Sequence, residues 1–198
     1  TIRFGKLNTI RLYITYVNFK SNTVMTSRIV TYGPPVLRKI AEPITENTEL
    51  EQTVNRMFSI LDKEEGIGLA APQIGISKRI FIIDTTPLIN DDPEIEIIRQ
   101  AFINPSIIEY SSEKSIYNEG CLSIPGIYEI VERPAHIKIS FSDMELKLVE
   151  KVLSGIEARI FQHEFDHLEG ILFTDRLDPM RKLLISSKLK KLQKSSRI

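Results

Sequence analysis

The feature that most restricts the fold of this chain is a pair of histidines, His163 and His167, placed four residues apart in a stretch of helical periodicity. Positions i and i+4 of an α-helix lie one turn apart on the same face, so both imidazoles can reach one metal ion. The opposite side of the stretch is apolar, with Ala158, Phe161, Phe165 and Leu168. The sequence therefore predicts a helix over about 155–169 that packs on one side and coordinates a metal on the other.

The residue after the first histidine is Glu164, which would project beside it, close enough to exchange protons with a metal-bound water. The alternative is that both histidines are surface residues of a polar helix face. The chain has only three histidines, however, and two of them fall in this pentad. We therefore favour the metal site. The third, His136, opens a predicted strand after Pro134 and is interpreted as structural.

The predicted metal-binding helix also has recognisable ends. Ser154 can act as its N-cap, with Glu157 three residues on in a capping-box pattern, and Gly170 supplies the stop. Near the start of the chain, Gly33-Pro34-Pro35 predicts a rigid turn that opens the folded domain.

Two further helices are predicted from apolar spacing. One covers 48–63, with Gly66 just beyond its end, and the other covers about 179–194, where Pro179 follows Asp178. Short strand candidates lie between the first two helices: Arg79–Asp84, Ala101–Asn104, the alternating Ile137, Ile139 and Phe141, and the pair Leu146 and Leu148. Strands in hairpin-like succession favour antiparallel pairing. We expect an α+β fold with short antiparallel β-sheets packed around the central metal-binding helix, and a C-terminal helix.

Composition is that of one globular domain. The chain has 198 residues, 42% hydrophobic and 26% charged, and at this length roughly 70% of the unfolded surface can be buried. The single cysteine cannot form an intramolecular disulfide, which fits a reducing compartment or a cysteine kept for its chemistry. No apolar run reaches the ~20 residues that cross a bilayer, so we expect a soluble protein without a membrane partner.

Charge is strongly segregated along the chain. Residues 1–41 and 179–198 each hold seven Lys or Arg and no acid, and the middle holds all 26 acids. An acid-free, basic, hydroxyl-bearing N-terminus resembles an organelle transit segment; the alternatives are an ordinary basic arm or residues added for expression. We expect an N-terminal extension over 1–28 and one catalytic domain over 29–198. Nucleic-acid binding would need basic residues clustered on a folded face with aromatic partners, and the sequence gives little indication of either, so no specific nucleic acid is expected.

A catalytic metal site needs a third protein ligand and one open position. Glu169 and Asp175 follow the histidine pair, and Cys121, the sole cysteine, precedes it. A buried inert cysteine is the alternative, but Gly120 permits close backbone approach and Glu119 lies two residues away. A separate cluster, Gly66–Gln73, joins small residues to the amide donor of Gln73. No phosphate-loop Lys-Ser/Thr follows it.

Together these segments resemble the signatures of one family, the peptide deformylases. The family patterns G-φ-G-φ-A-A-x-Q, E-G-C-L-S and Q-H-E-x-D-H appear in order and intact as Gly66–Gln73, Glu119–Ser123 and Gln162–His167. The resemblance spans about residues 29–195, and the lysine-rich terminal helix is similar to that of the bacterial and plastid branch. One departure is Tyr128, at a position where the family often has an arginine that contacts substrate.

The resemblance implies a metal-dependent hydrolase that removes the N-formyl group from the formyl-methionine of newly made peptides and releases formate. It implies Cys121, His163 and His167 as metal ligands with water in the fourth position. It also implies Glu164 as general base and then general acid, and Gln73 with the Leu122 N–H as donors to the oxyanion. The expected substrate contacts are Gly66, Ile67, Gly68, Tyr117, Glu119, Gly120 and Ile160, of which Ile67, Tyr117 and Ile160 would line the methionine pocket. Arg133 is expected to bridge toward Glu119 and Asp166.

One divalent metal is expected. The donor set suits several ions, and the resemblance implies Fe²⁺ in the cell, with Zn²⁺, Ni²⁺ or Co²⁺ in a purified sample. The competing enzyme is a zinc endopeptidase that uses only the histidine helix and takes Glu or Asp as third ligand. The non-enzymatic alternative is a structural metal site, which needs a closed shell of four ligands.

The expected partners are N-formyl-methionyl peptides and, transiently, the ribosome. The basic extension, and the absence of an initiating methionine at Thr1, favour a processed or trimmed organellar protein. A plastid, either apicoplast or chloroplast, is favoured over the mitochondrion. The cytoplasm is expected if the extension is not a targeting remnant.

Overall fold

The computed structural model describes residues 28–46, 48–90 and 93–196. The expected extension over 1–28 therefore lies outside the described residues, except for Arg28. The longer elements are, in chain order, α1 (Leu50–Lys63), β1 (Gly68–Ala70), β2 (Ile80–Asp84), β3 (Arg99–Tyr110), β4 (Lys114–Cys121), β5 (Ile124–Pro134), β6 (His136–Ser142), β7 (Leu148–Ser154), α2 (Gly155–Leu168) and α3 (Pro179–Ser195). Short 3₁₀ helices are η1 (Pro35–Arg38), η2 (Ala71–Ile74), η3 (Thr86–Leu88) and η4 (Phe173–Arg176).

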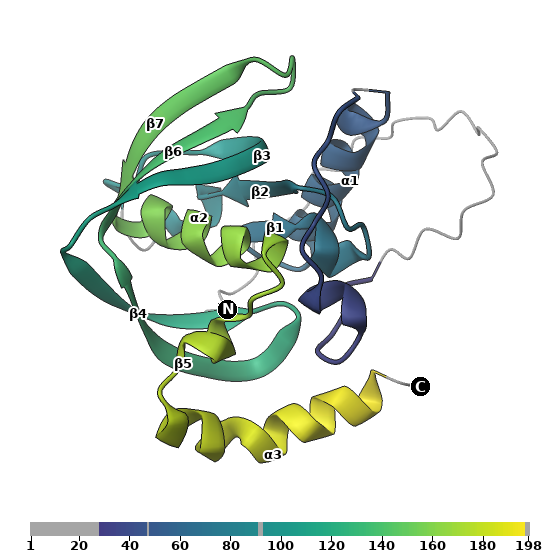
Figure 1. The fold of residues 1–198 in the computed structure, drawn as a ribbon, viewed down its shortest axis with the longest axis vertical. Coiled ribbons are helices and arrows are strands. Elements are labelled where there is room, and N and C mark those ends of the chain that lie inside the picture. The colour runs from purple at the N-terminus through teal and green to yellow at the C-terminus, as the bar shows by residue number, and fades with distance from the viewer. Residues whose placement is uncertain (1–27, 47, 91–92, 197–198) are drawn as a thin grey trace.

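The strands form two antiparallel sheets. Five of them pair in the order β1-β2-β3-β6-β7, and β4 and β5 form a separate two-stranded hairpin. α2 lies between the two sheets, α1 stands at the side of the larger sheet, and α3 runs beneath β5 (Figure 1). The predicted α+β fold, with antiparallel sheets around a central helix and a C-terminal helix, is confirmed.

The strand β2 shows why the larger sheet can carry helices on both faces. All five of its residues are buried. Side chains alternate along a strand, so Ile80 and Ile82 pack with the α1 side of the core, whereas Phe81 and Ile83 pack with the α2 side. The core is thus divided into two layers, and the layer beneath α2 supports the candidate site.

The apolar side of α2 packs as its sequence predicts. Ala158, Phe161 and Leu168 are fully buried, and the Phe161 ring meets Phe81 and Phe102 edge-on at centroid distances of 5.0 and 5.3 Å. Burying each such large side chain contributes roughly 1.5–3 kcal/mol. α2 is therefore held rigidly against the sheet.

The ends of α2 correct one expectation and support another. Ser154 occupies the N-cap position, but its side chain makes no capping hydrogen bond, so the predicted capping box is wrong. Ser154 is also the last residue of β7, and its extended backbone continues the pairing with His136 up to the helix. Gly170, the predicted stop, has a left-handed φ of 69°.

Several strand boundaries differ from expectation. The run 101–104 is the inner part of a much longer strand, β3. Leu146 lies in a turn with a φ of 60°, before β7 begins at Leu148. The sequence did not reveal β4 and β5 as strands, although Glu119–Cys121 ends β4. His136 opens β6 as predicted.

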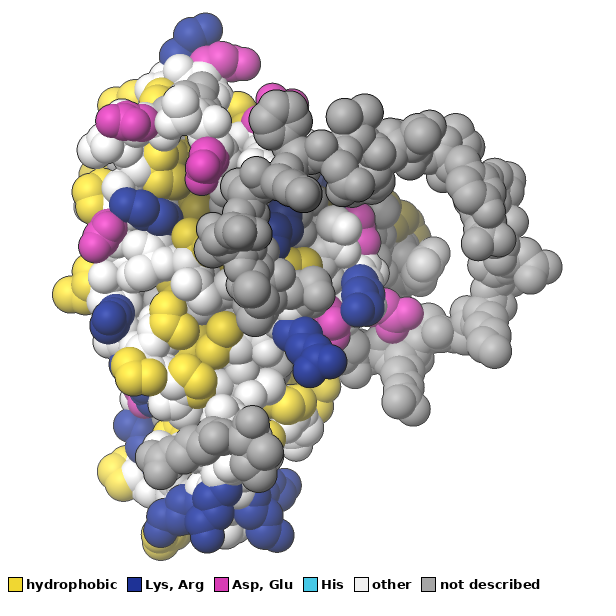
Figure 2. Space-filling view, turned by 90° about the vertical axis from the view of Figure 1, so that its right-hand side faces the viewer, with side chains coloured by type: hydrophobic (Ala, Val, Ile, Leu, Met, Phe, Trp, Pro, Cys, Tyr) yellow, Lys and Arg dark blue, Asp and Glu magenta, His cyan; other side chains and the backbone are white. Residues whose placement is uncertain are grey.

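α3 closes the molecule below the hairpin. Its Ile185 packs into a small core with Ile127, Val131 and Phe173, and the partly buried Leu189 and Leu192 pack against the same core. Lys and Arg side chains gather over this helix at the foot of the molecule (Figure 2). Within the described part of the chain, no helix has the length and apolar character of a membrane span.

Candidate active site

α2 presents His163 and His167 one turn apart, toward the hairpin. Their ring centroids are 5.3 Å apart, and both side chains are buried. The two imidazoles therefore converge on one point, as the i, i+4 spacing requires.

β4 supplies the third donor. Cys121 is the last residue of this strand and pairs with Ile124 across the tight turn to β5. Its Sγ lies 3.3 Å from His167 Nε2, and the donor atoms of Cys121, His163 and His167 all lie within 4.8 Å of one another. Elsewhere in the described ranges, no further set of three His, Cys, Asp or Glu side chains converges in this way.

The two acids considered as alternative third ligands, Glu169 and Asp175, form ion pairs with arginines. Glu169 forms an ion pair with Arg79, at 2.7 Å, and Asp175 pairs with Arg38 through both carboxylate oxygens. The endopeptidase interpretation with an acidic third ligand is thus not supported. One thiolate and two imidazoles suit a divalent transition metal, and three protein ligands leave one coordination position open.

Glu119 orients one of the three donors, His163, through a hydrogen bond to the ring nitrogen that faces away from the site. Its Oε2 accepts a hydrogen bond from His163 Nδ1 at 2.9 Å, which leaves Nε2 of that ring to face the site. Arg133 donates to both oxygens of Glu119 and, through Nη1, to Asp166 at 2.6 Å. The expected bridge from Arg133 to both acids is therefore present.

The charges of this network fix its protonation. Burial by itself raises the pKa of Glu119, but the hydrogen bonds from Arg133 and His163 outweigh it and hold the pKa well below its usual range. Glu119 is thus an ionised acceptor at neutral pH. Burial lowers the pKa of His167, so its ring is neutral, which is the form that can bind a metal.

Glu164 lies on the side of α2 that faces β1 and is only 4% exposed. Its Oε2 is buried and has no hydrogen-bond partner among the described residues. Burial raises the pKa of Glu164 to about 7. A carboxyl group with this pKa can both accept and donate a proton near neutral pH.

Gln73 is held by the loop that follows β1. Its Oε1 accepts from the Ala70 N–H at 2.7 Å, and its Nε2 donates to Ser123 Oγ at 3.2 Å and lies 3.5 Å from Cys121 Sγ. The carbonyl end of this amide is therefore fixed by its own loop, so the N–H end is turned toward the metal ligands.

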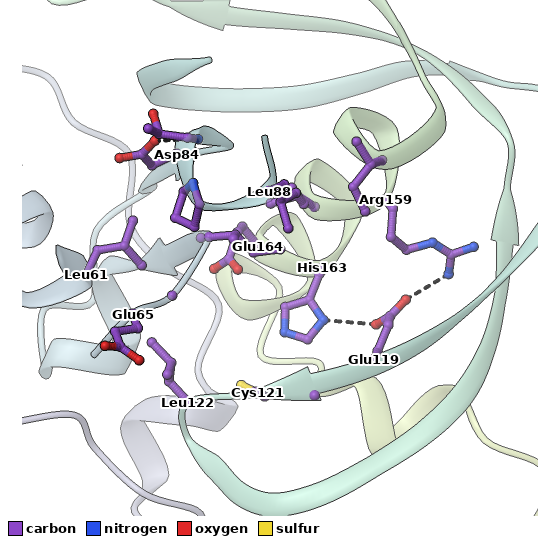
Figure 3. Close-up of a pocket in the computed structure, with 18 of the residues that line it drawn as sticks. Leu61, Glu65, Asp84, Leu88, Glu119, Cys121, Leu122, Arg159, His163 and Glu164 are labelled. Carbon is purple, nitrogen blue, oxygen red and sulfur yellow. Dashed lines mark hydrogen bonds and ion pairs between the residues drawn. The ribbon is translucent and has the colours of Figure 1, made fainter. Parts of the chain in front are cut away.

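These groups open into one cavity of about 1150 Å³. Figure 3 shows Glu164, His163 and Cys121 directed into it, with Glu119 bonded to the far side of the His163 ring. Of the expected site residues, all except His167 line the cavity: Gly66, Ile67, Gly68, Gln73, Tyr117, Glu119, Gly120, Cys121, Leu122, Ile160, His163 and Glu164. His167 lies behind, within reach of Cys121.

The sequence did not single out every residue of the cavity wall. The main additions are Asp84, Leu88, Arg99, Ile156 and Arg159. Arg159 is 4% exposed; its guanidinium lies 4.8 Å from the Tyr117 ring centre and donates to Glu119. The available signal was a lone arginine within 156–161, a stretch whose other residues, apart from Glu157, are apolar.

Tyr128 also lines the cavity, at its rim, and is 44% exposed. It pairs with Gly120 across the hairpin, and its ring covers the Gly120 backbone so closely that a Cβ there would overlap it. The residue that departs from the family pattern therefore stands at the rim of the cavity, opposite the residue that precedes Cys121.

The fold and the site together define a metallohydrolase: a cysteine sulfur and two imidazoles converge on one point beside a buried acid, at the edge of one cavity. The polypeptide deformylase family matches residues 26–183. Peptide deformylase of Thermotoga neapolitana is 43% identical over 171 residues, covering 86% of this chain and 98% of that protein.

Solved structures agree with this match. The Plasmodium falciparum peptide deformylase in complex with inhibitor has 43% identity and a TM-score of 0.73, over 83% of this chain and 98% of that one. An Arabidopsis thaliana peptide deformylase in complex with an inhibitor has 38% identity and a TM-score of 0.77, over 85% and 91%.

The chain belongs to the peptide deformylase family. It is a metal-dependent hydrolase that removes the N-formyl group from the N-terminal formyl-methionine of newly made peptides, with release of formate.

Proposed function

We propose that Cys121, His163 and His167 are the ligands of one divalent metal and that Glu164 carries the proton of the reaction. The observation that supports this best is the convergence of the three donor atoms within 4.8 Å, beside a buried carboxyl group. When bound there, a divalent ion supplies Lewis-acid activation of water and of a carbonyl oxygen.

Glu164 takes the proton of the attacking water and later delivers it to the amine that leaves. A pKa of about 7 lets one group do both. Glu164 shares α2 with both histidines, so its backbone is fixed relative to theirs. The C–N bond breaks as the nitrogen accepts the proton from Glu164. The second proton of the water then passes from the newly formed acid to the amine, so the products are formate and an ammonium group.

Gln73 and Leu122 stabilise the oxyanion. The Gln73 Nε2 lies 3.5 Å from Cys121 Sγ, and Leu122 follows Cys121 directly, so its backbone N–H is beside the same atom. One such donor typically contributes ~3–4 kcal/mol to transition-state stabilisation.

The formylated peptide enters between two walls. One is the loop with Gly66, Ile67 and Gly68; the other is the end of β4 with Tyr117 and Gly120. The apolar part formed by Ile67, Tyr117 and Ile160 holds the methionine side chain. Both carboxylate oxygens of Glu119 are engaged by Arg133, Arg159 and His163, so Glu119 serves the site chiefly by orienting His163.

The ion used in the cell is Fe²⁺. The donor set of one thiolate and two imidazoles accepts Fe²⁺, and it also accepts Zn²⁺, Ni²⁺ or Co²⁺, which a purified sample would contain according to its preparation. Metal analysis of protein purified without oxygen, set beside formate release for each ion, tests this assignment.

The chain functions in an organelle, with a plastid favoured over a mitochondrion. Plasmodium falciparum and Arabidopsis thaliana deformylases are among its structural neighbours, and residues 1–28 form a basic, acid-free stretch before the catalytic domain of 29–198. Fusion of the precursor's leader to a fluorescent protein tests this: diffuse cytosolic signal would overturn it. The basic surface over α3 supports transient contact with the ribosome (Figure 2).

Formate release from formyl-Met-Ala-Ser, with acetyl-Met-Ala-Ser as the matched control, tests the proposed chemistry. The Fe²⁺-loaded protein should release formate from the first peptide, and no acetate from the second. Cleavage of the Met–Ala bond instead would revive the endopeptidase alternative.

A further inference from the structure

We propose that Gly68 is a positioning residue for Glu164. Because Gly68 has no side chain, the Glu164 carboxylate can occupy the space that a Cβ at position 68 would fill. The inference rests on the role proposed above for Glu164, and it goes beyond the role of Gly68 as a peptide contact.

β1 presents alternate residues to two helices. Leu69 packs in the layer of α1, whereas Ala70 packs with Ala158 and Phe161 of α2. Since side chains alternate along a strand, position 68 faces α2 as Ala70 does. Both positions that face α2 thus hold very small residues, so the helix can lie close to the strand.

Glu164 projects from a position on α2 that is otherwise apolar. Phe161 and Leu168, three residues before it and four residues after it, are fully buried in the layer that contains Ala70. Residues with these spacings share one face of a helix. An acid is therefore placed between two core residues, opposite the strand position that has no side chain.

The distances at Gly68 single out one neighbour. A Cβ added there would lie 2.5 Å from Oε1, 2.9 Å from Cδ and 3.0 Å from Cγ of Glu164, and these are its three nearest atoms. The backbone of β1 is not the obstacle, because Gly68 is not among the glycines with positive φ. Gly68→Ala therefore introduces a steric overlap without backbone strain, and the Glu164 side chain is the group that has to move.

A methyl group at position 68 would move the carboxylate by about 1 Å, the shift that restores ordinary contact distances. Proton transfer depends on heavy-atom distances close to those of a hydrogen bond, so a displacement of this size reduces turnover. The metal ligands are not displaced, since the overlap does not involve them.

The test uses the full chain loaded with Fe²⁺ without oxygen, and formyl-Met-Ala-Ser as substrate. Gly68→Ala should keep one metal per chain and a Tm near that of the wild type, lower kcat at least tenfold, and change KM less than threefold. A crystal structure of the variant should show the Glu164 carboxylate displaced from β1. An unmoved carboxylate, or a raised KM with unchanged kcat, overturns the inference.

A double substitution separates positioning from a simple substrate clash. Aspartate is one methylene shorter, so Glu164→Asp should make room for the methyl group added at position 68. The loss in Gly68→Ala/Glu164→Asp should then be at least tenfold smaller than the product of the single losses. Gly66→Ala is the matched control, because its Cβ would meet Leu61 and Leu122 rather than Glu164. In Gly66→Ala/Glu164→Asp, the loss in kcat should equal the product of the two single losses.

If the losses in kcat of Gly68→Ala and Glu164→Asp simply multiply in the double variant, the inference is overturned. If Gly68→Ala alone fails to hold metal, recovery of metal and turnover in the double variant supports the inference, and continued loss overturns it. Full activity of Glu164→Ala would instead overturn the proposed role of Glu164 and this inference together. Activity lost in Glu164→Ala but retained in Gly68→Ala would overturn the inference alone.

Discussion

At the scale of single residues, Glu119 is the acceptor shared by three side chains of the site. Arg133, Arg159 and His163 all donate to its carboxylate, and the three donors are buried. Two guanidinium groups near one another are tolerated here because the carboxylate lies between them.

Glu119→Gln removes this charge and leaves the cations uncompensated. The variant should lose about 3–5 kcal/mol of unfolding free energy and bind metal about 10–100-fold more weakly, because His163 is no longer oriented by an anion. Urea unfolding of the metal-free protein and a chelator competition measure the two effects. Glu113→Gln, at the exposed Glu113–His136 pair, is the control; equal stability of the two variants would contradict the prediction.

Glu164→Ala should keep one metal per chain but lose about 10²–10⁴-fold in kcat, because proton transfer is removed and no ligand is. Metal analysis beside formate release measures this. Glu169→Ala, near the end of α2 and paired with Arg79, should retain activity. More than a few per cent of turnover in Glu164→Ala would refute the role of this residue.

Cys121→Ser should retain the fold but release Fe²⁺ or Zn²⁺ on dialysis, since a hydroxyl is a far poorer anionic ligand than a thiolate. Equilibrium dialysis followed by metal analysis measures the loss. Stoichiometric metal in the dialysed variant would show that Cys121 is not a ligand.

At the scale of elements, the hairpin of β4 and β5 is fastened to α2 through Arg159. Its guanidinium donates to the backbone oxygens of Ser115 and Val131 as well as to Glu119. Because α2 carries two of the proposed metal ligands and the hairpin carries the third, this attachment sets their separation.

Arg159→Met should therefore weaken both fold and site. We expect a loss of about 3 kcal/mol in unfolding free energy, because buried acceptors lose their donor, and a lower metal affinity. Urea unfolding and chelator competition test this, with Arg181→Met at the half-exposed Arg181–Glu129 pair as control. Unchanged metal affinity in Arg159→Met would show that the attachment of the hairpin by Arg159 does not set the ligand geometry.

The elements differ in how far the sequence reveals them. α2 was predictable because its apolar and coordinating residues follow the helical period. β4 was not, because the usual alternation is reversed: Tyr117 and Glu119 face the site, while Ile116 on the other face is 64% exposed. The three proposed ligands were predicted from their chemistry and the family resemblance, but Arg159, Leu88 and Asp84 reach the cavity from separate elements, and only the fold brings them together.

At the scale of the whole molecule, the chain's first described residues connect two parts of the site. The Val30 N–H donates to the Gln73 carbonyl at 2.7 Å, and the Tyr32 N–H donates to the Ser123 carbonyl at 2.8 Å. The segment therefore joins the loop after β1 to the turn after β4, although it precedes both in sequence.

Deleting residues 1–28 should leave kcat and KM within about twofold, because the anchoring bonds begin at residue 30. Deleting 1–33 should lower both kcat and Tm, since two buried backbone bonds are lost, each contributing about 1 kcal/mol. Steady-state kinetics and thermal denaturation of the two truncated proteins measure this. Similar behaviour of both would mean that the segment does not brace the site.

The placement of Glu164 among core residues bears on attempts to make the enzyme more heat-resistant. Filling gaps between a strand and a helix is a common route to higher melting temperature, but between β1 and α2 the gap is occupied by Glu164, the proposed proton carrier. Substitutions that fill the space between β1 and α2 would yield proteins with a higher melting temperature and a lower kcat. Improvements compatible with activity should instead accumulate in the α1 layer or under α3, where the packed side chains belong to other clusters.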